Sequence, residues 1–326
     1  MRNLIRHILA AAMVLTGLMV TPSAAQQAAW PNRAVTLVVP FTAGGSSDTI
    51  ARAMAEHVSA AIGQPVVIEN RGGAGGNVGA ASVAKAAADG YTILLGTTGP
   101  AATNTLMYKN LTFDSRRDFA PIVLIGKTPV IVVARSEAPF RNMKELIAYA
   151  NANPSKLTAG FPGNGTLGHI TGVLLRQQAG VDMKHVQYRG GPPIISDLLG
   201  GHIDIAMDAM TPYVPVVQAG KLRALAIAGA TRWKQLPDVP TVSEAGLPGF
   251  EATVWYCLLA PSGVPGDAVA KLNAATNDYL KSAKAQALFE QLGIIISGGT
   301  PADLKTFIDQ EIEKWGPVVR AAKIEF

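Results

Sequence analysis

Short runs of β-branched and aliphatic residues alternate along this chain with longer segments in which apolar positions recur every three or four residues. The first pattern is typical of buried strands and the second of amphipathic helices that cover a sheet. After a strand predicted at 34–39, for example, Ile50, Met54 and Val58 follow helical spacing until Gly63 ends the pattern. The alternation predicts an α/β fold of two parallel-dominated sheets, built from strand, helix, strand units.

The length of 326 residues is enough for two domains. An apolar stretch at 122–134, with a bend expected at 127–129, predicts a crossing from one lobe to the other. A strand at 254–260 predicts the return crossing, and two crossings imply a hinge. We expect a first lobe at 26–127, a second at 128–252, and a return segment at 253–326 whose three helices pack on the first lobe.

The first 25 residues have the composition of a cleavable secretory signal. Two arginines precede an apolar run at 8–20, which ends in Ser23-Ala24-Ala25. This run is too short to span a bilayer as a stable helix, and the small residues match a cleavage site. We therefore expect a signal peptide at 1–25, cleavage before Gln26, and a soluble periplasmic protein.

Composition narrows the class of partner. The chain is 48% hydrophobic and 16% charged, which is typical of a folded protein with large cores. Residues 1–25 carry two arginines and no acidic residue, so the net charge of +5 falls to 5 − 2 = +3 after cleavage. Lysines and arginines are dispersed rather than clustered, which argues against nucleic acid. Cys257 is the only cysteine and lies in an apolar run, which predicts a buried, inert thiol.

Signatures of catalysis are absent from the sequence. It contains no G-x-S-x-G elbow and no Walker lysine. The five histidines show no metal-ligand spacing, and the cysteine has no C-x-x-C partner. We predict a protein that is not an enzyme and that has neither a cofactor nor a metal.

Each predicted lobe contains two glycine-rich junctions that lead from a strand into a helix. In open parallel sheets, ligands bind beyond the carboxyl ends of the strands, where such junctions gather. Glycine lets the backbone approach a ligand, and the following helix presents unpaired N–H groups at the positive end of its dipole. Together they predict an anion site between the lobes. The junctions are 40–48 and 96–100 in the first lobe, and 161–169 and 188–193 in the second.

Each of four side chains in or near these junctions could have either of two roles. Asp48 lies in a predicted first helical turn, where a structural role as loop organiser is favoured over catalysis. Arg189 either meets a carboxylate or is a solvated surface residue, and His169 either points into the cleft or only packs. Asp208 follows an apolar strand and could hold a water or a loop donor.

The chain also resembles the Bug proteins, the extracytoplasmic solute receptors of tripartite tricarboxylate transporters. The resemblance covers nearly all of the chain after the signal. It is carried by Trp30-Pro31 through Val39-Pro40-Phe41, Ala43-Gly44-Gly45 with Asp48, Glu69-Asn70-Arg71-Gly72-Gly73-Ala74-Gly75-Gly76, Ala88-Asp89-Gly90-Tyr91-Thr92, Gly165-Thr166 with His169, Tyr188-Arg189-Gly190 with Pro193, Asp197-Leu198 with Gly200-Gly201, and Leu236-Pro237-Asp238-Val239-Pro240-Thr241 with Glu244.

The resemblance implies a two-lobed Venus-flytrap fold of the type II-like periplasmic binding proteins. A ligand would lie between the lobes, held by backbone groups, hydroxyls and two ordered waters. Its carboxylate end would meet the 165–166 and 189–190 side, and its far end the first lobe. Polar residues there favour a dicarboxylate or substituted acid, while Phe41, Tyr213 or Trp255 would suit an aromatic acid unless they belong to the core. The predicted ligand-binding residues are Phe41, Thr42, Ala43, Gly45, Ser46, Ser47, Thr97, Thr98, Gly165, Thr166, His169, Arg189, Gly190 and Asp208.

The functional hypothesis is a monomeric periplasmic binding protein that delivers a small carboxylate to the membrane permease subunits of such a transporter. The alternative keeps the same capture of ligand but signals through a membrane sensor kinase. A periplasmic hydrolase is a third class, disfavoured by the missing nucleophile and metal signatures.

Overall fold

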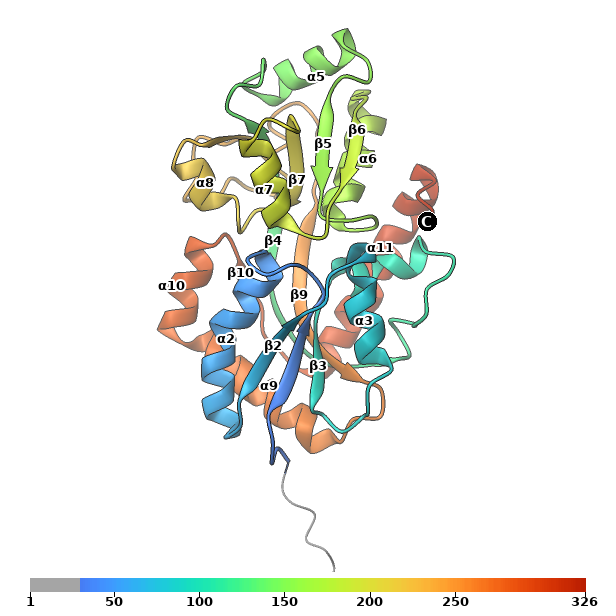
Figure 1. The fold of residues 1–326 in the computed structure, drawn as a ribbon, viewed down its shortest axis with the longest axis vertical. Helices are drawn as coiled ribbons and strands as arrows, with labels where there is room; N and C mark the ends of the chain where they lie inside the picture. The colour runs from blue at the N-terminus through green and yellow to red at the C-terminus, as the bar shows by residue number, and fades with distance from the viewer. Residues whose placement is uncertain (1–29) are drawn as a thin grey trace, which may run out of the picture.

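The computed structural model describes residues 30–326, so the predicted signal peptide at 1–25 lies outside the described part of the chain. The described chain is an elongated molecule in which strands and helices alternate, and this confirms the α/β class (Figure 1). Two groups of strands follow each other along its long axis, and β4 and β9 run between them (Figure 1).

The helices and strands follow the predicted order closely. In the first part of the chain they are β1 (Val35–Val39), α2 (Ser46–Ile62), β2 (Val66–Asn70), α3 (Asn77–Ala84), β3 (Thr92–Thr97), α4 (Thr98–Ala101) and β4 (Phe119–Arg135). In the middle part they are α5 (Met143–Ala152), β5 (Thr158–Phe161), α6 (Leu167–Ala179), β6 (Lys184–Gln187), α7 (Gly191–Leu199), β7 (Ile205–Ala209), α8 (Val214–Gln218) and β8 (Leu222–Ile227). The last part contains β9 (Thr253–Pro261), α9 (Gly266–Lys281), α10 (Ala283–Gln291), β10 (Ile295–Ile296) and α11 (Pro301–Ala322).

The parallel strand pairs lie toward the two ends of the strand order, and the antiparallel pairs lie between them. β1 pairs in parallel with β2 and β3, and β5 pairs in parallel with β6 and β7. The long strand β4 pairs antiparallel with β9 over its first part and with β7 and β8 over its second. The two sheets are therefore joined through β4, and the strand order is β2-β1-β3-β9-β4-β7-β5-β6.

The expected bend at 127–129 does not occur, because β4 continues through these residues as one strand. Pro129 pairs with Thr253 of β9, and its carbonyl accepts a hydrogen bond from the Met210 N–H at 3.1 Å. Proline removes a donor from a strand but keeps its acceptor, so a position that uses only the carbonyl tolerates it. The crossing is therefore a continuous strand rather than a broken one.

Helix α11 differs from the expectation that all three C-terminal helices pack on the first lobe. Its first half does so, since Leu304 and Ile308 are buried against β9 residues such as Trp255. Its second half buries Trp315 and Val319 in the core around β5 and β7. An apolar stripe that runs the whole length of a 22-residue helix can serve two cores, and α11 bridges them.

Candidate ligand-binding site

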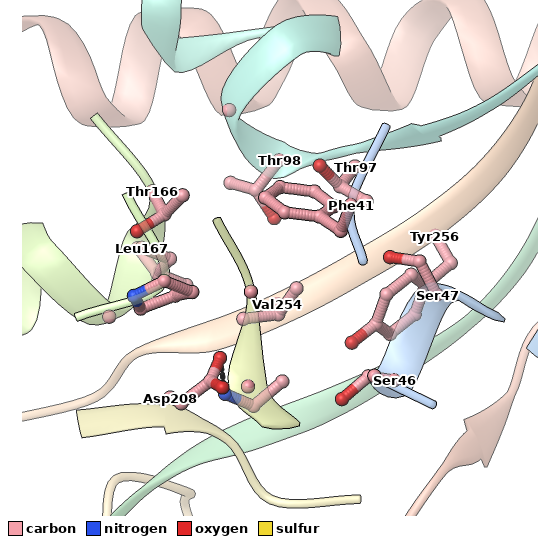
Figure 2. Close-up of a pocket in the computed structure, with 17 residues that line it drawn as sticks. Phe41, Ser46, Ser47, Thr97, Thr98, Thr166, Leu167, Asp208, Val254 and Tyr256 are labelled. Atoms are coloured by element: carbon pink, nitrogen blue, oxygen red, sulfur yellow. Dashed lines mark hydrogen bonds between the residues drawn. The ribbon is translucent and has the colours of Figure 1, made fainter. Parts of the chain in front are cut away.

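A pocket lies where the carboxyl ends of β1 and β3 meet those of β5, β6 and β7. It contains about 500 Å³ of space between protein atoms, including its mouth to solvent. Side chains from both sheets point into it (Figure 2). Nine of the fourteen predicted binding residues line it. They are Phe41, Gly45, Ser46, Ser47, Thr97, Thr98, Thr166, Gly190 and Asp208.

Four helices begin at this pocket. Their N-cap residues are Gly45 for α2, Thr97 for α4, Thr166 for α6 and Gly190 for α7, and all four line it. None of these caps accepts a hydrogen bond from its own helix through a side chain. The first-turn N–H groups of α2 and α6 are therefore left for a ligand, and the dipoles of these two helices favour negative charge there. Pro192 and Pro193 in the first turn of α7, and Pro100 in α4, have no N–H to offer.

The loop before α2 is held by Asp48, which agrees with the predicted role of this residue. Its buried carboxylate accepts hydrogen bonds from the Gly44 N–H at 2.8 Å, from Arg52 Nε at 2.9 Å and from Asn70 Nδ2 at 3.0 Å. Burial alone would raise the pKa of Asp48, but these three donors together lower it below the usual value. The ionised carboxylate thus fixes the glycine loop and leaves the α2 N-terminus free.

Within residues 30–326, Asp208 is the only charged residue that lines the pocket, and the lining contains no lysine, arginine or histidine. Its Oδ1 accepts a hydrogen bond from the Ala209 N–H at 2.7 Å, and its Oδ2 accepts one from the Tyr213 hydroxyl at 3.3 Å. Burial raises the pKa of Asp208 to about 7, although both donors oppose the shift. The side chain therefore titrates near neutrality.

Tyr256 of β9 lines the pocket and was not among the predicted residues. It is 1% exposed. Burial raises the pKa of its hydroxyl above the usual value, a hydrogen bond with Ser46 opposes the shift, and the Asp208 carboxylate adds to it. This hydroxyl lines the pocket beside Ser46 and can donate a hydrogen bond to a ligand. The available signal was a tyrosine hydroxyl in a mostly apolar return strand.

Most of the other lining residues that were not predicted adjoin a predicted residue in sequence, and the exceptions are Pro162 and Val254. Most are small or apolar residues that present backbone rather than side-chain groups. They are Gly99, Pro162, Leu167, Gly168, Gly191, Ala209 and Val254. Among the aromatic residues proposed to stack on a ring, Phe41 lines the pocket, whereas Tyr213 and Trp255 are buried and do not.

Five predicted binding residues do not line the pocket. The Arg189 side chain is exposed, and its carbonyl instead accepts a hydrogen bond from the Thr42 N–H at 3.2 Å. This bond joins the junction after β1 to the junction after β6. Ala43 lies beside Thr42 in the same loop, and Gly165 packs against Asn104 and Tyr108. Thr42, Ala43, Gly165 and Arg189 thus shape the junctions without facing the space between them.

His169 points away from the pocket, contrary to one of its two predicted readings. In α6 each residue is rotated by about 100° from the one before it, so Leu167 and Gly168 face the pocket and His169 does not. Its Nε2 lies 3.2 Å from His185 Nδ1, and its ring packs against Phe326. Burial, with the neighbouring His185, lowers the pKa of His169 to about 4, so the imidazole is neutral near pH 7.

Within residues 30–326, no group of three or more histidine, cysteine, aspartate or glutamate side chains is arranged to hold a metal ion. In the same part of the chain, none of the helices combines the length and the apolar character needed to cross a membrane.

Comparison with known proteins decides the family. Residues 50–324 match the sequence model of the tripartite tricarboxylate transporter family receptor, named TctC. The chain belongs to this family. The periplasmic binding protein BugD has a similar structure, with a TM-score of 0.88 and 36% sequence identity over 91% of this chain and 99% of BugD. These findings confirm the resemblance to Bug receptors and the periplasmic binding-protein fold predicted from sequence.

Two solved structures of similar proteins carry a ligand in their descriptions. An R. palustris protein with adipate has a TM-score of 0.88 and 38% identity, covering 91% of this TctC-family chain and 99% of its own. MatC from Rhodopseudomonas palustris, with bound malate, has a TM-score of 0.86 and 35% identity, covering 89% and 100%. Adipate and malate are both dicarboxylates.

Proposed function

We propose that this TctC-family receptor is a periplasmic solute-binding protein that captures a small carboxylate in the pocket between its two sheets. The observation that carries the proposal is the convergence of four helix N-termini, with full first turns of N–H groups in α2 and α6, on a pocket whose described lining has no lysine, arginine or histidine. Backbone N–H groups at helix N-termini bind carboxylates without a charged partner. The bound solute would then pass to the membrane permease subunits of a tripartite tricarboxylate transporter.

The two sides of the pocket suit a ligand with two polar ends. α6 and α7 begin on one side, while α2 and α4 begin on the other, with Ser46 and Thr98 among the hydroxyls. The relatives described with adipate and malate support a dicarboxylate. Phe41 also lines the pocket, and an aromatic acid could stack on its ring.

The test is a thermal-shift series on the purified chain without its signal, using adipate, malate and an aromatic acid. A ligand that binds only the folded state stabilises it by about 2.7 kcal/mol at one hundred times its Kd, which raises Tm by several degrees. The diamide of adipic acid is the matched control, because it has the same length and no charge. Equal shifts with the acid and the diamide, or no shift with any acid, would contradict capture of a carboxylate.

Two threonines of α6 offer a matched pair of variants. Thr166 and Thr171 are both buried, and each donates a hydrogen bond of 2.7 Å to a backbone carbonyl. Only Thr166 lines the pocket. Thr166→Val and Thr171→Val should each cost about 1 kcal/mol of stability, but only the first should weaken ligand binding.

A further inference from the structure

Two kinds of polar group surround the pocket: groups that favour a bound anion, and a carboxylic acid. The helix N-termini and the Tyr256 hydroxyl are suited to bind an anion, whereas Asp208 is itself an acid. An ionised Asp208 would repel a bound carboxylate, and no cation in the lining offsets it. The side chain is 7% exposed, so water screens it little.

The position of Asp208 keeps its carboxyl facing the pocket. It lies near the end of β7, and the Ala209 N–H and the Tyr213 hydroxyl hold its two oxygens. A Cβ added at Gly191 would lie 2.8 Å from its Oδ2, so the carboxyl stands directly against the first turn of α7. Figure 2 shows Asp208 and Thr166 on one side of the pocket, with Ser46 and Ser47 on the other.

The titratable groups on the neighbouring elements do not neutralise Asp208. Tyr213 and Tyr256 are hydroxyl donors whose pKa values burial raises, so both stay protonated. On α7, Asp197 accepts a hydrogen bond from the Tyr188 hydroxyl, which adds negative rather than positive charge. α6 carries His169, which pairs with His185 away from the pocket, and Arg176, which pairs with Asp182.

We propose that capture of the anionic ligand is coupled to protonation of Asp208, whose neutral carboxyl then donates a hydrogen bond to a ligand carboxylate. This rests on the proposed function. One proton from solvent enters the pocket with each anion and leaves with it. The exchange removes the repulsion and adds a donor at the one place in the lining where an acceptor would face the ligand.

The direction of the pH dependence follows from this coupling. The pKa of about 7 for Asp208 means that near neutral pH the proton is available at little cost. Below that pKa the carboxyl is already neutral and affinity is highest. Above it, each ligand must bring a proton, so affinity falls by up to about tenfold per pH unit.

The experiment is isothermal titration calorimetry with adipate and malate between about pH 6 and pH 9, where ordinary carboxyl groups are fully ionised. Repeating each titration in two buffers with different heats of ionisation measures the protons taken up. We expect uptake that approaches one proton per ligand at high pH, together with the fall in affinity. Binding that is independent of pH and releases or absorbs no proton would overturn the proposal.

Two variants test Asp208 as the group responsible. Asp208→Asn keeps a permanent donor and cannot titrate, so it should bind with no proton uptake and hold its affinity at high pH. Tyr213→Phe removes a hydrogen bond that lowers the pKa of Asp208, so the midpoint of the pH profile should move upward. A merely structural role for Asp208 predicts no such movement. The Tyr213→Phe result stands even where Asp208→Asn does not fold.

The main competing source of a profile near neutrality is a histidine. His57 lies in α2 beyond the pocket and pairs with Asp278, so His57→Gln should leave the profile unchanged. A profile that survives in Asp208→Asn, or disappears in His57→Gln, would contradict the proposal. A third result would also contradict it: Asp208→Asn binds malate more weakly than the wild type does, and only at high pH. In that case an ionised Asp208 would be accepting a hydrogen bond from the malate hydroxyl. Failure of the wild type to bind any acid at any pH would instead refute the proposed function.

Discussion

Gly165 shows how one residue of a binding loop can act through packing. Its φ is +75°, a conformation that glycine adopts freely, and a Cβ there would lie 2.6 Å from Asn104 Oδ1 and 2.8 Å from Tyr108 Cε2. Asn104 and Tyr108 belong to the segment after β3, across the pocket from α6. The close approach of the two sides therefore depends on the missing side chain.

Substitution of Gly165 by alanine should weaken both stability and ligand binding. The backbone strain costs about 1 kcal/mol, and the clash adds about 1–3 kcal/mol or forces the two sides of the pocket apart. Gly220→Ala is the matched control, since Gly220 has a φ of +70° and open space where the Cβ would go. Thermal unfolding and adipate titration of both variants measure the difference. Equal losses in the two variants would show that Gly165 matters only through its backbone.

At the scale of elements, α11 and the residues after it connect the two sheets. The Phe326 N–H donates to the Met107 carbonyl at 2.9 Å, and the Phe326 ring packs between Tyr108 and His169. Tyr108 follows β3, while His169 lies in α6. The same segment therefore contacts both sides of the pocket outside its opening.

Removal of the Phe326 ring should favour an open arrangement of the two sheets. Each aromatic pair contributes about 0.5–1.5 kcal/mol, and Phe326→Ala loses two of them. We expect a larger radius of gyration in small-angle X-ray scattering without ligand, and a several-fold weaker ligand affinity. Glu325→Gln is the control, because it removes only the exposed ion pair with Lys109. An unchanged radius and affinity in Phe326→Ala would contradict this role.

At the scale of the whole molecule, Cys257 can show whether the central part of the sheet is folded, because it lies in β9, which runs between the two groups of strands. It is fully buried in β9, paired with Gly96 of β3 on one side and with Leu124 of β4 on the other. Burial raises the pKa of its thiol well above the usual value. This confirms that the cysteine is buried, and a buried thiol with a raised pKa can serve as a probe of global unfolding.

Labelling of Cys257 by a thiol reagent should be slow in the native protein and fast in denaturant. Because β9 is central to the sheet, exposure of the thiol requires unfolding rather than movement of a loop. A saturating ligand should slow the labelling further, in proportion to the stability it adds. Rapid labelling under native conditions would show that the sheet opens locally, and a Cys257→Ser variant supplies the background rate.

The sequence by itself determined the order of helices and strands and the four junctions that face the pocket. These features are local, since apolar periodicity and glycine-rich turns are read from residues close together in the chain. The same local signals placed Gly45, Thr97, Thr166 and Gly190 in these junctions, and all four line the pocket. The structural role of Asp48 also followed from its place in the first turn of α2.

Only the tertiary structure decided which side chains of those junctions face the ligand space. A rotation of about 100° per residue along α6 separates the direction of Thr166 from that of His169. Local sequence patterns do not determine which of these residues faces the pocket. Tyr256 enters the pocket because β9 crosses between the sheets, and α11 bridges two cores because both lie along its apolar stripe. The raised pKa of Asp208 has the same origin. Burial raises its pKa, and burial is a property of everything that packs around a residue rather than of its neighbours in sequence.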